Sequence, residues 1–96
     1  MFKLSKLALV LSIAATSISA APLEPDAIYK SDWTKKHAQA LANDASMLIR
    51  RAGYRCDTES SISKWVFSVG FDITCNSYRY KYEVEDRGGE WEARLK

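Results

Sequence analysis

The chain has 96 residues, with 14 lysines and arginines against 12 aspartates and glutamates, and a formal net charge of +2. Without the first 20 residues, whose pattern is that of an export leader, 76 residues with a net charge near zero remain. This balance excludes a nucleic-acid binder that relies on excess positive charge. The length excludes two hydrophobic cores, a dinucleotide-binding fold and an α/β barrel, so we expect one small domain.

The N-terminus has the layout of a secretory signal peptide. A short basic opening precedes an apolar run over residues 7–18, and small side chains lead up to Pro22. The apolar run is too short for a membrane-spanning helix, which needs roughly 20 residues. We expect cleavage after Ala20, with cleavage after Ala21 as the alternative, and a mature bacterial protein that is periplasmic or secreted, without stable membrane insertion.

Two cysteines, Cys56 and Cys75, are the only ones in the chain. In an exported protein such a pair predicts a disulfide, which should stabilise a domain of this size by about 3 kcal/mol. A zinc site would need three or four ligands, and His37 is the only histidine. The cysteines are not arranged as C-x-x-C, so a thioredoxin-like redox role is not indicated. We expect neither a metal nor another cofactor.

The first half of the mature chain is predicted to contain a single helix. Residues 21–30 carry two prolines and no periodic pattern, which predicts a loose leader before a domain over residues 31–96. The helix should begin at Ser31 or Asp32, both good N-cap residues, and end near Ala52. Its apolar face follows helical spacing through Trp33, His37, Leu41, Ala45, Leu48 and Ala52.

The second half changes to the period of two that is typical of strands. Apolar and polar side chains alternate over residues 54–59, 71–76, 78–85 and 90–95. Turn signals at Asn76-Ser77 and Asp86–Gly89 favour an antiparallel meander. We therefore predict an α+β fold, in which one N-terminal amphipathic helix packs on a four-stranded antiparallel sheet whose other face meets water.

The predicted disulfide restricts how the cysteine-bearing strands can pair. One long strand over residues 64–75 would place Cys56 opposite Phe67, about 26 Å from Cys75 at the usual strand rise, whereas a disulfide needs Cα atoms within roughly 7 Å. Direct pairing of Cys56 with Cys75 satisfies the disulfide and makes residues 61–70 a long connection. We favour this second register; a third arrangement, in which the two strands are not neighbours, stays open.

That connection carries three consecutive large apolar residues, Trp65, Val66 and Phe67. Consecutive side chains of an extended segment point to opposite sides, so either both sides are covered or one is exposed. Exposed Trp and Phe residues are typical anchors of a binding interface, and long connections in small domains are often functional. Trp65, Val66 and Phe67 are therefore a candidate binding loop, unless they close the end of a thin core.

Other chemistry-bearing residues have structural explanations. An aromatic row could form a second binding face, or could pack beneath the helix, which we favour: Tyr78, Tyr80, Tyr82 and Trp91. His37 lies on the predicted apolar face, and no G-x-S-x-G motif supports a serine hydrolase. The carboxylates are expected to form a solvated surface: Asp57, Glu59, Asp72, Glu83, Glu85, Asp86, Glu90 and Glu92.

Three segments of the mature chain carry a resemblance: GYRCD at residues 53–57, GFDITCN at 70–76 and YRYKYEVEDRGGEW at 78–91. They resemble a group of small exported bacterial proteins, which has no activity that could be transferred to this chain. The order of helix and strands is loosely similar to PepSY-type periplasmic modules. That similarity implies a role in binding or inhibition.

These features favour a small non-enzymatic binding module, with an inhibitory or accessory role, whose partner is a protein of the cell envelope or outside the cell. An alternative is a small-ligand or glycan-binding protein that uses the tyrosine and tryptophan face. A small hydrolase that uses His37 and a serine is the last alternative. No nucleic acid is expected as a partner.

Overall fold

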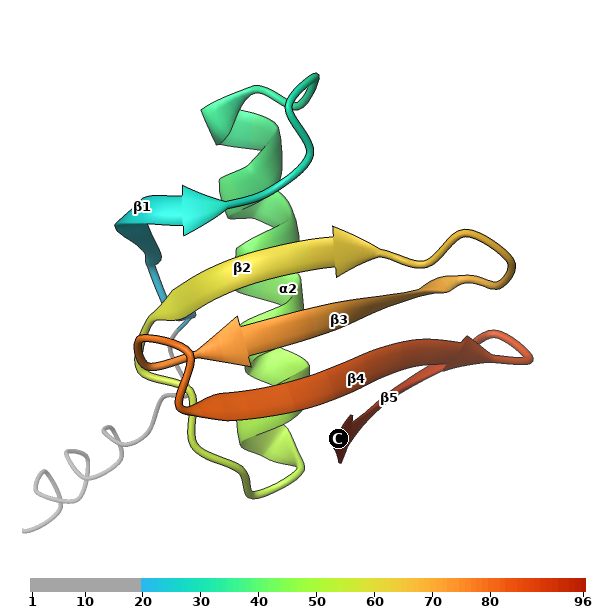
Figure 1. Ribbon diagram of the computed structural model, residues 1–96. Helices are drawn as coiled ribbons and strands as arrows, with labels where there is room; N and C mark the ends of the chain where they lie inside the picture. The colour runs from blue at the N-terminus through green and yellow to red at the C-terminus, as the bar shows by residue number, and fades with distance from the viewer. Residues whose placement is uncertain (1–19) are drawn as a thin grey trace, which may run out of the picture.

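The computed structural model describes residues 20–96 as one helix packed against one face of a sheet (Figure 1). The sheet has five strands in the order β1-β2-β3-β4-β5; β1 is parallel to β2, and the other neighbours are antiparallel. The elements are β1 (Leu23–Ile28), α2 (Lys35–Arg51), β2 (Glu59–Lys64), β3 (Gly70–Cys75), β4 (Tyr80–Arg87) and β5 (Glu90–Leu95). The α+β class is confirmed, whereas the four-stranded antiparallel meander is wrong. Apart from Ala20, the predicted signal peptide lies outside the described residues.

A strand occupies the segment that we predicted to be a loose leader. Leu23–Ile28 forms β1 at the edge of the sheet, and the backbone N–H of Glu59 donates to the carbonyl of Pro22 (2.9 Å). The parallel pairing of β1 with β2 is made through α2, because parallel neighbours need a crossover connection. Prolines are tolerated in an edge strand, where a missing N–H need not pair. Because prolines are typical of loops, their presence led us to predict a loose segment here.

The helix begins later than predicted and turns a different face to the sheet. Its N-cap is Thr34, whose Oγ1 accepts from the N–H of His37 (3.0 Å), and not Ser31 or Asp32. The buried face is made mostly of small side chains, which bring the helix close to the sheet: Ala38, Ala42, Ala45, Ser46 and Ile49. His37 is exposed, with its ring edge-on to Trp33, so the packed role predicted for it is wrong.

The hairpins of the second half follow the predicted alternation. Ile73, Cys75, Tyr82 and Val84 face α2 and are buried, and neighbouring residues on these strands form the opposite, polar face. The β4–β5 connection is Gly88-Gly89, and both residues have the positive φ that a two-residue type I′ turn requires (64° and 95°). This predicted turn is confirmed.

The polar face of the sheet carries both cations and carboxylates, which form ion pairs. Arg94 contacts Glu83 (2.9 Å) and Glu85 (2.7 Å), and Lys96 contacts Asp72 (3.1 Å). The hydrogen bond from Arg94 holds the pKa of the Glu85 carboxyl below its usual value. These carboxylates are partly buried and paired with cations of the same face.

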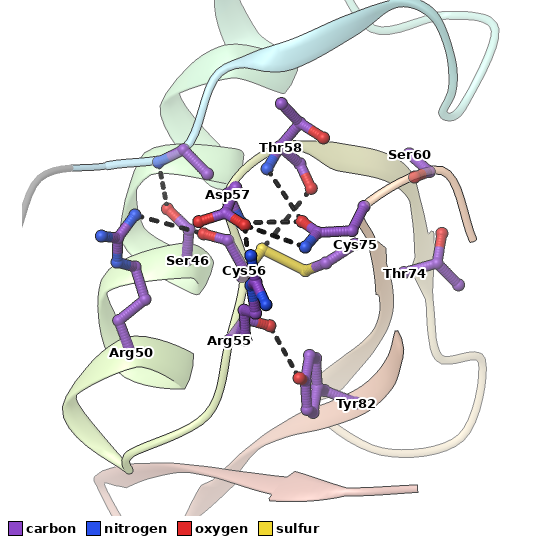
Figure 2. Close-up of a disulfide and its surroundings, with 12 residues drawn as sticks. Ser46, Arg50, Arg55, Cys56, Asp57, Thr58, Ser60, Thr74, Cys75 and Tyr82 are labelled. Carbon is purple, nitrogen blue, oxygen red and sulfur yellow. Dashed lines mark hydrogen bonds and ion pairs between the residues drawn. A yellow bond between two sulfur atoms is a disulfide. The ribbon is translucent and has the colours of Figure 1, made fainter. Parts of the chain in front are cut away.

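The disulfide between Cys56 and Cys75 is present, with a Cα–Cα distance of 5.2 Å (Figure 2). It does not lie in the register that we favoured, because Ile62 pairs with Ile73 and Lys64 with Phe71. Cys56 instead lies before β2, where its carbonyl accepts from Arg50 Nη1 of α2 (3.2 Å; Figure 2). The predicted strand at 54–59 is therefore wrong: the disulfide ties the α2–β2 connection to the end of β3, outside the main ladder.

The β3–β4 turn adopts an unusual backbone. Asn76, Ser77 and Tyr78 all have positive φ (55°, 54° and 67°), a conformation that costs L-residues roughly 1–2 kcal/mol each. Hydrogen bonds hold the turn: the N–H of Ser77 donates to Glu24 Oε2 (2.8 Å) and that of Tyr78 to Ser60 Oγ (3.0 Å). Hydrogen bonds to β1 and to β2 thus hold the strained turn in place.

Replacing Ser77 with glycine is expected to raise the free energy of unfolding by about 0.5–1 kcal/mol, because glycine adopts a positive φ without steric cost. Ser77 is exposed, and its contact to Glu24 uses the backbone N–H, which the variant retains. Ser68→Gly is the matched control, since Ser68 is exposed and is not among the residues with positive φ. Urea unfolding measures both; equal destabilisation of the two variants would contradict the assignment.

Candidate functional site

The loop between β2 and β3 presents apolar side chains to solvent. Val66 is 84% exposed, Phe67 is 99% exposed, and Val69 is also exposed. We call Val66, Phe67 and Val69 the apolar tip. Figure 1 shows this loop and the β4–β5 turn at the same end of the sheet, beyond the helix. The structure therefore exposes Val66 and Phe67 of the predicted binding loop and adds Val69, which sequence analysis missed.

Trp65 anchors the loop that carries the apolar tip to strand β3. Its N–H donates to the carbonyl of Gly70 (2.9 Å), and its indole Nε1–H donates to Asp72 Oδ1 (3.1 Å). The indole also lies directly over Gly70, where an added Cβ would come within 2.6 Å of the ring. Trp65 is half-buried and fixes the base of the loop, so it is a positioning residue.

Two further contacts define the surroundings of the apolar tip. The backbone N–H of Asp86 donates to the carbonyl of Val69 (3.0 Å), which ties the loop to β4. Lys30 and Lys64 lie beside the loop and line a shallow hollow with it. The result is an apolar projection beside two lysines, of which Lys30 also contacts Asp32 through its ammonium group (3.4 Å).

The tyrosines of the row do not share one exposed face, since only Tyr78 is exposed. Tyr82 is 2% exposed, stacks on Tyr54 with ring centroids 5.3 Å apart, and donates its hydroxyl proton to the carbonyl of Arg55 (2.7 Å). Burial raises the pKa of Tyr82. Tyr80 is half-buried against the core, and Tyr78 lies in the strained turn. The interpretation that the row packs beneath the helix is confirmed for Tyr82.

Trp91 lies apart from the tyrosines, at the edge of a groove between α2 and the sheet. It stacks on Phe71 with ring centroids 6.2 Å apart. The groove has a volume of about 510 Å³, and its walls come from the helix and from β2 to β5. Most lining side chains are apolar, while Asp44 and Arg51 of α2 contribute charge. This groove could hold an apolar molecule of modest size.

Glu59 is the residue whose burial differs most from the prediction. It was expected on the solvated face, but it is 0% exposed. Within residues 20–96, its two carboxyl oxygens are the only buried side-chain N or O atoms without a hydrogen-bond partner. Burial raises the pKa of Glu59 to about 9. An irregularity in the β2–β3 pairing between Glu59 and Ser61 breaks the alternation on which the prediction depended.

Glu24 is a second carboxylate with a structural role. Its Oε2 accepts from Thr58 Oγ1 (2.7 Å), Ser60 Oγ (2.7 Å) and the N–H of Ser77 (2.8 Å). Burial alone would raise the pKa of Glu24, but these hydrogen bonds together lower it. Glu24 therefore joins β1 to the start of β2 and to the β3–β4 turn.

Comparison with protein-family models, with curated proteins and with solved structures gave no match for this chain. In the part of the chain that the structure describes, no group of three or more His, Cys, Asp or Glu residues could hold a metal ion. No helix within residues 20–96 has the length and apolar character to cross a membrane. Function is therefore inferred from the geometry of the apolar tip and the groove.

Proposed function

We propose that this protein is a non-enzymatic binding module of the bacterial periplasm or cell exterior, with an accessory or inhibitory role. It inserts the apolar tip into an apolar pocket on a protein of the envelope or on a secreted protein. The observation that carries the proposal is the almost complete exposure of Phe67 on a loop that Trp65 holds in place.

Burial of the tip in a partner supplies the binding free energy. A fully buried Phe or Val side chain contributes about 1.5–3 kcal/mol through removal of apolar surface from water. The hydrogen bonds of Trp65 to Asp72 and of Asp86 to Val69 fix the loop before binding. Because a fixed loop loses little conformational freedom on association, less of this contribution is lost to ordering the loop.

The cations beside the tip indicate the character of the partner. Lys64 lies beside the loop, as does Lys30, which also pairs with Asp32 (3.4 Å). Opposite charges around an apolar contact raise the association rate and set the orientation of the complex. The partner we propose therefore has an apolar pocket with an acidic rim. Binding should weaken with added salt through a slower association rate.

Export is part of the proposal. The N-terminal residues have the pattern of a signal peptide, and the disulfide between Cys56 and Cys75 fits an oxidising compartment. Both features support a location in which envelope and secreted proteins are available as partners.

Replacing Phe67 with serine is expected to weaken partner binding by about tenfold or more, the loss typical of an interface anchor. The processed protein, coupled through its C-terminus, would capture partners from a periplasmic extract, and calorimetry would give the affinity for the captured protein. Leu95→Ser is the matched control, because Leu95 is also an exposed apolar residue but lies on β5, away from the loop. Equal affinities of wild type and Phe67→Ser, at equal stability, would refute the proposal.

A second candidate function is the binding of a small apolar or glycan ligand in the groove between α2 and the sheet. Its volume of about 510 Å³ lies in the range of small-molecule sites, roughly 300–1,000 Å³. Trp91 and Phe71 offer a stacked aromatic surface there. Titration with a panel of apolar metabolites and glycans should change tryptophan fluorescence, and Trp91→Phe should remove the change while Trp33→Phe retains it. A panel without effect would count against this candidate.

A further inference from the structure

Glu59 lies next to the first residues that follow the expected cleavage site. It is the first residue of β2, pairs with Leu23 of β1 and donates its backbone N–H to the carbonyl of Pro22 (2.9 Å). Directly paired residues share a face of a sheet, and Leu23 packs against the hydrophobic core. The buried carboxyl of Glu59 therefore lies on the helix-facing side, beside the chain that emerges from Ala21.

Ala21 is itself fixed in the interior. It is 1% exposed, and its backbone N–H donates to Ser46 Oγ of α2 (2.8 Å), which Figure 2 shows as the dashed line that reaches Ser46. Ser46 Oγ donates in turn to the carbonyl of Asn43 (3.2 Å). Gln39 holds the next residues, since its Oε1 accepts from the N–H of Leu23 (3.1 Å). The nitrogen of Ala21 thus occupies a fixed position against the helix.

We infer that removal of the leader between Ala20 and Ala21 turns the nitrogen of Ala21 into a buried ammonium group that forms an ion pair with Glu59. Water adds across the peptide bond: Ala20 keeps the new carboxylate, and the nitrogen of Ala21 becomes a protonated amine. An ammonium has three protons to donate. One continues to bind Ser46 Oγ, and the others are directed at the Glu59 carboxylate. This inference depends on the export leader and not on the proposed partner.

The orphaned state of Glu59 is the reason for this assignment. A neutral carboxylic acid would need an acceptor for its O–H, and an ionised one would need a cation; within residues 20–96 neither oxygen has a hydrogen-bond partner. An unpaired buried carboxyl is costly in either protonation state. Burial holds the pKa of Glu59 at about 9, and a neighbouring cation would lower that pKa again.

The ion pair makes the processed chain more stable than its precursor. While the leader is attached, the nitrogen of Ala21 is an uncharged amide with one proton, so Glu59 stays without a partner. Cleavage supplies the missing charge at a position already fixed by Ser46. Only chains that have been exported and processed therefore gain the stabilisation from this ion pair.

A double-mutant cycle tests the inference. Four proteins are compared: the chain begins either at Ala21 or at Ala20, and position 59 carries either Glu59 or the substitution Glu59→Gln. Each protein is released from a cleavable N-terminal fusion and oxidised to form the disulfide. Ala20 should raise the unfolding equilibrium constant by roughly 150-fold or more with Glu59, as expected for one lost partner of a buried ion pair, and by less than about threefold with Glu59→Gln. The structure contains Ala20 in place, so the extension itself fits.

Three outcomes would overturn the inference. The first is an equal effect of Ala20 in both backgrounds of the cycle. The second is an exported protein whose intact mass shows a first residue other than Ala21. The third is an α-amine that reacts with an acylating reagent as fast in the folded protein as in urea. This labelling experiment uses the wild-type residue at position 59, so it tests the inference even if Glu59→Gln does not fold. Glu24→Gln, on strand β1 just after Ala21, is the control and should keep the full effect of Ala20.

Discussion

Replacing Tyr82 with alanine is expected to lower the free energy of unfolding by about 3–5 kcal/mol, the cost of removing a large aromatic side chain from a core. Tyr82 is among the largest fully buried side chains of the described residues and stacks on Tyr54. Its removal leaves a cavity between α2 and β4 and breaks the hydrogen bond to Arg55. Urea unfolding followed by circular dichroism measures the loss.

Tyr82→Phe separates the hydroxyl from the ring. It should cost about 1 kcal/mol, because only the hydrogen bond to the carbonyl of Arg55 is lost. Tyr78→Phe is a suitable comparison, since the Tyr78 hydroxyl also donates to a backbone carbonyl, that of Ser60, but its side chain is exposed. A Tyr82→Ala variant as stable as Tyr82→Phe would show that the ring is not part of the core.

Removing the disulfide is the second change with a large expected effect. Cys56→Ser combined with Cys75→Ser should lower the free energy of unfolding by about 3 kcal/mol, because the unfolded chain regains the entropy of the closed loop. The cysteines are separated by 19 positions and are both buried. For a small domain with a stability of about 5 kcal/mol, this loss leaves a marginal fold.

Reduction of the wild-type protein provides the control for the serine variant. Both treatments open the same loop, so dithiothreitol should reproduce most of the loss without a change of residue. Urea unfolding of the oxidised, reduced and variant proteins gives the comparison. An unchanged midpoint after reduction would contradict the stabilising role of the disulfide.

The second half of the fold was largely predictable because its alternation is regular. Val84 and Ile73 occupy the face that the period of two assigns to them, and Gly88-Gly89 forms the expected turn. The disulfide followed from the cysteine count and the leader. The segment around Phe67 was a candidate loop because consecutive side chains of an extended segment point to opposite sides, so that one side is exposed unless both are covered.

The remainder depended on contacts between residues distant in the sequence. β1 has no alternation and contains Pro25, so nothing local distinguishes it from a loose segment. The helix buries small residues such as Ala42, whereas Leu41 and Leu48, which the spacing placed on the apolar face, lie partly buried beside them. Glu59 turned inward at a pairing irregularity, and Cys56 reached Cys75 from beyond the end of β2.

The parallel attachment of β1 has a consequence for the order in which the protein assembles. The neighbours from β2 to β5 are joined by short connections, whereas β1 reaches β2 only after the whole of α2 has been placed between them. Contacts across such a separation carry a larger entropy cost and form late. The hairpins can therefore nucleate the sheet, and the N-terminal strand closes it last, when the chain around Ala21 is free to settle against the helix.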